Sequence, residues 1–213
     1  MKKTTLKLID EFFSSHENLT CVKEQTVEAI NVLLKSAESG KILVCGNGGS
    51  AADSEHISGE LLKAFRLKRE IPSKLKSELA KLGEKGVYAA DNLEGGIKCI
   101  PLTSLNSAIT AYSNDKFADL SYAQLVNALG EKGDSLIAIS TSGNAENVYL
   151  AALTARAKGV KVVSLTGGTG GKLSDVSDAA IISPEKETYL VQETHLPIYH
   201  LICAALENEI FGE

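Results

Sequence analysis

Long apolar runs, paired cysteines and an excess of positive charge are all missing from this sequence. No run of about 18 apolar residues occurs, so no membrane-spanning helix is expected. Asp10 and Glu11 interrupt the first apolar stretch, which disfavours a signal peptide. No C-x-x-C pair occurs among Cys21, Cys45, Cys99 and Cys203. We therefore expect buried, reduced thiols and a cytoplasmic protein.

The charge balance is mildly acidic. The 213 residues include 22 Lys and Arg against 27 Asp and Glu, which gives a net charge of −5. Such a chain is a poor non-specific ligand for polyanions, so we expect no nucleic-acid or membrane partner. The length suits one large domain. No linker-like stretch or internal repeat divides residues 1–213, which predicts a single domain.

Short apolar runs alternate with helical patterns after Gly40. Runs without polar alternation predict strands that are covered on both faces, and strands alternating with helices predict a parallel α/β sheet. Residues 1–39 are expected to form N-terminal helices, split near Ser14, Ser15 and Asn18. The five expected strands cover residues 42–45, 97–102, 135–139, 161–165 and 179–182. The pattern predicts a five-stranded parallel sheet flanked by helices.

The segment 66–96 departs from this alternation and is expected to be a helical insertion, or flap. Residues 66–85 carry seven basic side chains against three acidic ones. A short helix is expected between Pro72 and Gly83. Its apolar stripe would be formed by Leu75, Leu79 and Leu82. Two interpretations stay open: a solvated helix packed on the body, and a basic lid near a phosphorylated ligand.

A glycine-rich loop follows the first expected strand and opens a helix. It covers residues 45–52 (CGNGGSAA). Its glycines Gly46, Gly48 and Gly49 let the backbone approach a ligand closely, and free N–H groups at a helix start favour an anion. The spacing matches neither the dinucleotide fingerprint nor a Walker A loop. An anion-binding loop is one interpretation, and a tight turn without a ligand is the alternative.

A second polar loop, residues 140–144 (STSGN), follows the expected strand 135–139. Ser140, Thr141 and Ser142 suit the oxygens of a phosphate monoester, although Ser and Thr are also common helix caps. Both loops follow the carboxyl ends of parallel strands, where ligands bind open α/β sheets. Neither loop carries a cation, so we expect a small phosphate and no nucleotide cofactor.

Three of the four histidines fall in two expected helices. His56 and Glu60 lie four residues apart on one helix face, where they could be acid–base groups, ligands of one metal, or an ordinary surface contact. The last helix carries Gln192, His195 and His200, and His195 is expected to be a core or interface residue.

Residues 45–61 (CGNGGSAADSEHISGEL) and 139–148 (ISTSGNAENV) resemble the sugar isomerase (SIS) domain family. The resemblance covers nearly the whole chain apart from the flap. It implies a flavodoxin-like α/β fold and an aldose–ketose isomerase that acts on a sugar phosphate. The implied reaction converts sedoheptulose 7-phosphate to D-glycero-D-manno-heptose 7-phosphate through an enediol. A homotetramer with active sites at subunit boundaries is also implied.

The resemblance assigns roles to particular positions. Glu60 and His200 match the catalytic acid–base pair. His56, Glu60, Gln192 and His200 match positions that hold one zinc ion per subunit. The positions expected to contact substrate are Asn47, Gly48, Gly49, Ser50, Glu60, Asn114, Asp115, Ser140, Thr141, Ser142 and Gln192.

Three features depart from the family pattern. Ala145 stands where the family often has serine. After Glu60 the family commonly has Gly-Arg-aromatic, whereas this chain has Leu62-Lys63-Ala64-Phe65. An arginine that could contact the substrate is therefore missing, and Lys63 and Arg66 are candidate replacements. The flap is extra. Two alternatives therefore stay open: an isomerase of another sugar phosphate, and a non-catalytic SIS protein that binds a phosphosugar or a protein.

Overall fold

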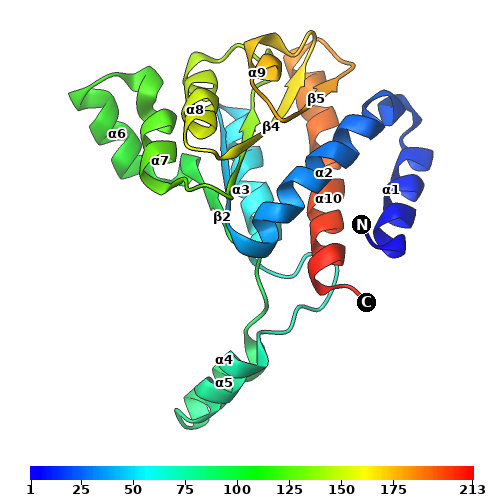
Figure 1. Cartoon of the computed structure of the whole chain (residues 1–213), viewed down its shortest axis with the longest axis vertical. Helices are drawn as coiled ribbons and strands as arrows, with labels where there is room; N and C mark the ends of the chain where they lie inside the picture. The colour runs from blue at the N-terminus through cyan, green and yellow to red at the C-terminus, as the bar shows by residue number, and fades with distance from the viewer.

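The fold is built on one sheet of five parallel strands, described over residues 1–213 of a computed structural model (Figure 1). The strand order is β2-β1-β3-β4-β5, which is the flavodoxin-like order. The strands are β1 (Ile42–Gly46), β2 (Cys99–Pro101), β3 (Ser135–Ile139), β4 (Lys161–Gly167) and β5 (Ala179–Ser183). The predicted α/β class and sheet are confirmed.

The edge strand β2 is shorter than the predicted strand 97–102. It pairs only with β1, through the register Ile42↔Cys99 to Val44↔Pro101. Pro101 has no N–H with which to extend a ladder, and Leu102 already belongs to the 3₁₀ turn η2 (Leu102–Ser104). The central pair, β1 and β3, runs in register from Ile42↔Ser135 to Gly46↔Ile139, with every residue of both strands buried.

Two helical layers cover the sheet, and strand residues alternate between them. Val44 packs with the layer of α2 (Lys23–Ser39), α3 (Gly49–Leu62) and α10 (Thr188–Phe211). Leu43 packs with the opposite layer of α7 (Ser121–Leu129), α8 (Glu146–Ala157) and α9 (Gly171–Asp175). The remaining helices outside the flap are α1 (Lys3–Ser15), η1 (Glu17–Val22), α6 (Asn106–Asp115) and η3 (Ala118–Leu120). The predicted split of the N-terminal helices falls between α1 and α2.

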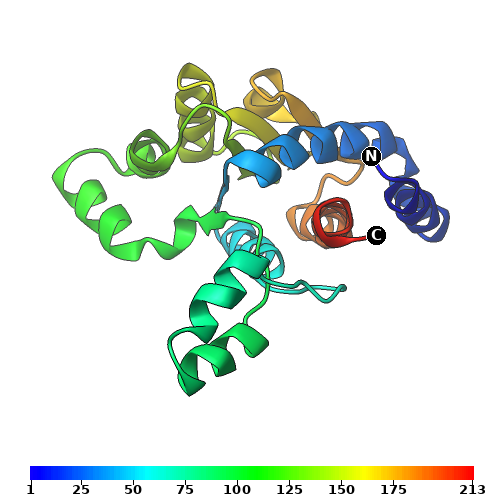
Figure 2. The ribbon, with the colours of Figure 1, turned by 60° about the horizontal axis from the view of Figure 1, so that its bottom comes forward.

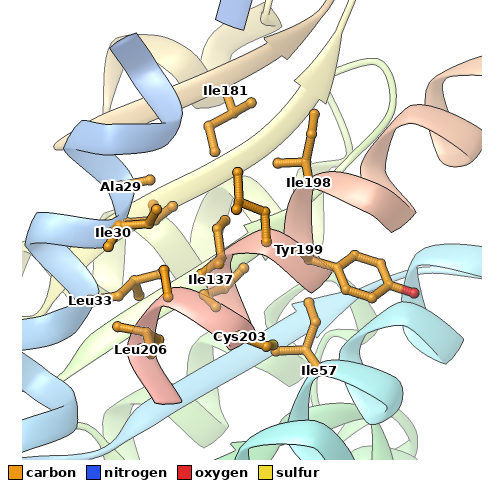
Figure 3. Packing of buried hydrophobic residues seen from close by; sticks show 14 of the residues in the cluster. Ala29, Ile30, Leu33, Ile57, Ile137, Ile181, Ile198, Tyr199, Cys203 and Leu206 are labelled. Carbon is orange, nitrogen blue, oxygen red and sulfur yellow. The ribbon is translucent and has the colours of Figure 1, made fainter. Parts of the chain in front are cut away.

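The larger core joins α2, α3 and α10 to the sheet. Figure 3 shows Ile30 and Leu33 of α2 beside Ile137 of β3, with Leu206 of α10 in the same cluster. All four side chains are fully buried or nearly so. Tyr199 of α10 also belongs to the cluster, but its hydroxyl points away from it (Figure 3). This packing fixes α10 against α3, and both helices carry candidate site residues.

The flap is a helical hairpin that projects from the body (Figures 1 and 2). Its helices are α4 (Ser73–Ala80) and α5 (Glu84–Asn92), and the glycine between them, Gly83, has a φ of 82°. The predicted single helix is therefore wrong in part, because a second helix follows Gly83. The predicted apolar stripe is not buried: no residue of α4 is buried, and Leu82 is 75% exposed.

Within a single chain, the flap occupies neither of the two expected positions, against the body or over the ligand loops. The flap leaves α3 after Leu62 and returns to β2 at Cys99. Because α3 starts at the carboxyl end of β1 and runs back along the sheet, its last residues lie at the amino edge. The glycine-rich loop and the loop at 140–144 lie at the carboxyl edge. The hairpin is thus neither packed on the body nor placed as a lid over its own chain's loops.

The cysteines agree with the expectation of free thiols, with one correction. All four are free, and Cys45, Cys99 and Cys203 are buried, whereas Cys21 is exposed on η1. Burial raises the pKa of the Cys45 thiol to about 12. None of the helices has the length and apolar character that crossing a bilayer would require.

His195 is a core residue, as predicted. It is 0% exposed, and its Nε2 lies 3.0 Å from the Thr166 carbonyl oxygen of β4. This geometry makes Nε2 the protonated nitrogen, and Nδ1 is buried without a partner. Burial lowers the pKa of His195 below its usual value, because the cation would lose its hydration.

We predict that His195 makes folding sensitive to mild acid. In the unfolded chain a histidine binds a proton near pH 6.5, whereas folded His195 stays neutral to lower pH. The free energy of unfolding should therefore fall as pH drops below about 6.5, by at most about 1.4 kcal/mol per pH unit. Urea unfolding at pH 8 and pH 5 measures this. A His195→Gln variant should show a smaller pH dependence, and an unchanged dependence would contradict the assignment.

Candidate active site

The glycine-rich loop begins α3 at the carboxyl end of β1. Gly48 has a φ of 56°, a conformation that favours glycine. Asn47, Gly48 and Gly49 are exposed, whereas Ser50 is buried in the first turn of α3. No side chain caps this helix start. Its N–H groups and positive dipole end are therefore free to bind an anion.

The loop at 140–144 lies next to the glycine-rich loop, because β1 and β3 are neighbours in the sheet. Asn47 Nδ2 donates to Asn147 Oδ1 (2.8 Å), and Asn147 Nδ2 donates back to Asn47 Oδ1 (2.9 Å). This reciprocal amide pair links the glycine-rich loop to the first turn of α8, directly after the second loop. It lies where the strand order reverses, which is where such sheets bind ligands. Sequence reasoning missed Asn147, because its partner is 100 residues away along the chain.

Close backbone packing shapes the second loop. Gly143 has a φ of 66°, and a Cβ there would collide with the Gly170 carbonyl of the next loop. The hydroxyl of Ser140 lies 3.4 Å from the Ala145 N–H, and that of Ser142 accepts from the Asn144 N–H (3.2 Å). Both serines thus shape the turn before α8, and Ser142 stays exposed to a ligand.

The side chain of Gln192, on α10, packs against the glycine-rich loop. A Cβ placed on Gly49 would lie 2.5 Å from Gln192 Nε2 and 3.0 Å from its Cδ. Glycine at position 49 therefore makes room for this amide. The structure thus places Gln192 beside this loop, and its contact with substrate stays a prediction.

His56, Glu60 and His200 form one cluster between α3 and α10. His56 Nε2 lies 3.3 Å from Glu60 Oε1 and 3.4 Å from His200 Nε2. The second carboxylate oxygen, Glu60 Oε2, is buried without a hydrogen-bond partner. Burial lowers the pKa of His200, and His56 lowers it further while Glu60 raises it. The net lowering of this pKa favours the neutral form of His200.

Asp53 and Tyr199 hold the other side of His56. The Tyr199 hydroxyl donates to Asp53 Oδ1 (3.3 Å) and lies 3.0 Å from His56 Nδ1. With the hydroxyl proton given to Asp53, the phenol oxygen accepts from His56 Nδ1–H, and Nε2 faces Glu60 and His200. Burial raises the pKa of Asp53, with Tyr199 and His56 opposing it. Sequence reasoning missed Asp53, although its spacing of three from His56 places both on one helix face.

The four residues expected to hold zinc do not converge in this chain. The separations of 3.3 and 3.4 Å within the cluster are close to the about 3.4 Å between two tetrahedral zinc ligands. Gln192, however, lies against Gly49, about two turns of α10 from His200. No group of three His, Cys, Asp or Glu has an arrangement that could hold a metal ion. The expected ligand set therefore fits only as pairs.

A groove of about 390 Å³ between α1 and α10 reaches His200. Phe65 and Arg66 line it beside His200, and the Phe65 ring lies 5.6 Å from the His200 ring. Of the two candidate replacements for the missing arginine, Arg66 lies in this groove, whereas Lys63 donates to the neighbouring Ala64 carbonyl (3.0 Å).

Asn114 and Asp115 are not brought to the cluster. Both are exposed at the end of α6, and Asn114 Nδ2 donates to Asp115 Oδ1 (3.0 Å). Helix α6 lies at the outer edge of the molecule in Figures 1 and 2. No hydrogen bond joins either side chain to the two loops. Their expected contact with substrate stays a prediction.

A family model and several curated proteins match this chain. The family model for the SIS domain matches residues 97–206. The phosphoheptose isomerase of Helicobacter pylori strain P12 is 35% identical over 207 residues, covering 94% of this chain and 95% of its own. That of Aliarcobacter butzleri is 36% identical over 208 residues, covering 95% and 97%.

Solved structures agree. The phosphoheptose isomerase of Neisseria gonorrhoeae matches with a TM-score of 0.69 and 31% identity, over 95% of this chain and 93% of the other. That of Francisella tularensis matches with a TM-score of 0.74 and 28% identity, over 98% and 100%. These matches accompany two polar loops at the strand-order reversal and the cluster of His56, Glu60 and His200 about two helix turns below them. The chain belongs to the SIS domain family and, within it, to the phosphoheptose isomerases.

Proposed function

We propose that the chain converts sedoheptulose 7-phosphate to D-glycero-D-manno-heptose 7-phosphate. The observation that carries this proposal is the cluster of His56, Glu60 and His200, in which His56 lies 3.3 Å from the Glu60 carboxylate and 3.4 Å from the His200 imidazole. The cluster lies on the two helices whose N-terminal turns meet at the glycine-rich loop. The similarity to phosphoheptose isomerases supports the choice of substrate.

The phosphate would bind at the carboxyl edge of the sheet. Ser140, Thr141 and Ser142 supply hydroxyls, and the start of α3 supplies N–H groups and a positive dipole end. Gln192 lies between this edge and His200, where it suits a hydroxyl of the sugar chain. Binding the phosphate at one end would direct the opposite end of the open-chain sugar toward Glu60 and His200.

Glu60 would carry the proton between carbons. The carboxylate removes a proton from C1, the C1–C2 double bond forms, and the C2 carbonyl oxygen takes up a proton to give the enediol. Glu60 then returns its proton to C2, while the O1 hydroxyl loses its proton and C1 becomes the aldehyde. The neutral His200 would move the proton between O1 and O2. His56, fixed by Tyr199, orients both groups.

We predict that Glu60→Gln abolishes turnover and spares binding. The amide cannot carry a proton, so kcat should fall by about 10²–10⁴-fold, whereas the phosphate loops are untouched. Proton NMR of the aldose signal measures turnover, and calorimetry measures binding of sedoheptulose 7-phosphate. Glu55→Gln, on the exposed side of the same helix, is the matched control and should keep full activity. Normal turnover by the Glu60 variant would rule out this role.

We also propose that the chain binds a zinc ion. The residues expected to hold it are His56, Glu60, Gln192 and His200. The separations of 3.3 and 3.4 Å support His56, Glu60 and His200, whereas Gln192 would join them only across a subunit boundary. We expect one zinc ion per chain, measured by mass spectrometry of the purified protein. His56→Ala should lower the zinc content. A metal-free protein that turns over substrate at full rate would contradict the proposed zinc site.

A homotetramer with active sites at subunit boundaries is also proposed. The apolar groove lined in part by Leu8, Phe12 and Leu201 is open in one chain, and His200 of the candidate site lines it too. Light scattering at micromolar concentration should give four times the chain mass of 22.6 kDa. A monomeric mass would contradict this assembly.

Because three of the four free cysteines are buried thiols, we also propose a cytoplasmic location.

A further inference from the structure

A buried ion pair lies outside the acid–base cluster, where α3 and α10 end. Arg69, from the root of the flap, donates from Nε to Glu207 Oε1 of α10 at 2.7 Å. Both side chains are 0% exposed. The guanidinium also lies over the Phe211 ring, 5.2 Å from its centre. A buried pair of this kind contributes little net stability compared with apolar residues of similar shape. What it does provide is a fixed position for the groups that it binds.

Arg69 fixes the end of the helix that carries Glu60. Its Nη1 donates to the Leu61 carbonyl (2.7 Å), and its Nη2 donates to the Glu60 carbonyl (2.9 Å). The last carbonyls of a helix have no partner within the helix, and a cation there is favoured by the helix dipole. One guanidinium thus binds the backbone of the catalytic carboxylate residue itself.

Glu207 fixes the surroundings of His200. Its two carboxylate oxygens accept from the N–H groups of Phe65 and Arg66, each at 2.9 Å. Phe65 is the residue whose ring lies against His200, 5.6 Å away. Glu207 also follows His200 by seven residues, so the two lie on nearly the same side of α10, two turns apart.

We propose that Arg69 and Glu207 are positioning residues for the isomerase, and that their ion pair sets the separation and orientation of Glu60 and His200. The inference rests on the proposed function, because it assigns the pair a role in that reaction. The pair joins the backbone at Glu60 to the segment that packs on His200. A displacement of about 1 Å between reacting groups can lower a rate by about a hundredfold. The phosphate loops lie at the other edge of the sheet and are independent of the pair.

Glu207→Gln tests the proposal with little change in shape. The amide accepts through one oxygen only, so a backbone N–H of the 65–66 turn loses its partner and Phe65 moves relative to His200. We expect kcat to fall by about tenfold or more while KM changes by less than about twofold. The His200 Cε1–H signal in a ¹H–¹³C NMR spectrum should shift. Arg69→Lys keeps the charge but loses the three-way contact, and should act in the same direction.

Asp134→Asn is the matched control. Asp134 is also a buried carboxylate that accepts from two backbone N–H groups, those of Lys41 (2.9 Å) and Glu131 (2.8 Å), and pairs with a cation, Lys41 Nζ (2.6 Å). It lies at the amino edge of β1 and β3, away from α10. This variant should lose stability with kcat within about twofold of the wild type and an unmoved His200 signal.

The outcomes separate the two proposals. If the wild type does not turn over sedoheptulose 7-phosphate, the proposed function fails, and the inferred role in catalysis fails with it, whatever the NMR signals show. If the wild type is active and folded Glu207→Gln and Arg69→Lys keep kcat, the inference is overturned. It is also overturned if Asp134→Asn loses as much kcat at an equal loss of thermal midpoint. Should Glu207→Gln not fold, Arg69→Lys decides the question.

Discussion

The packing of α10 against α3 on one face of the sheet is the constraint on which the site depends. Glu60 and His200 belong to helices separated by most of the chain, and only this packing brings them into one cluster. Ile57 and Leu61 of α3 lie in the same core cluster as Ile198 and Cys203 of α10, all nearly fully buried. The polar cluster is therefore held by an apolar contact directly beneath it.

The sheet order supplies the second part of the site. Because β1 and β3 are neighbours, the loops that follow them meet at the carboxyl edge, and the Asn47–Asn147 amide pair joins the first loop to the start of α8. Helices α3 and α10 both start near this edge, which places Gln192 on Gly49 and His200 beside His56 about two turns below. The distance from the glycine-rich loop to the cluster of His56, Glu60 and His200 is thus set by helix geometry.

Much of this could be predicted from the sequence, because the signals were local. Apolar runs gave the strands, glycine and hydroxyl residues marked the two loops, and the four-residue spacing of His56 and Glu60 placed them on one face. The ion pair of Arg69 and Glu207 could not be predicted, because the two residues are 138 positions apart and the sequence around each is typical of an exposed charge. The second flap helix was missed because Gly83 ends one helix but equally permits another to begin.

The distribution of the site along the chain also affects its biosynthesis. Domains fold as units as they emerge from the ribosome, and here the last helix supplies Gln192, His200 and Glu207. Until α10 is made, one face of the sheet stays uncovered, Arg69 has no counter-charge, and Glu60 faces water. A nascent or truncated chain that lacks this helix would thus combine an exposed apolar face with an unpaired cation, which are features that chaperones and proteases act on.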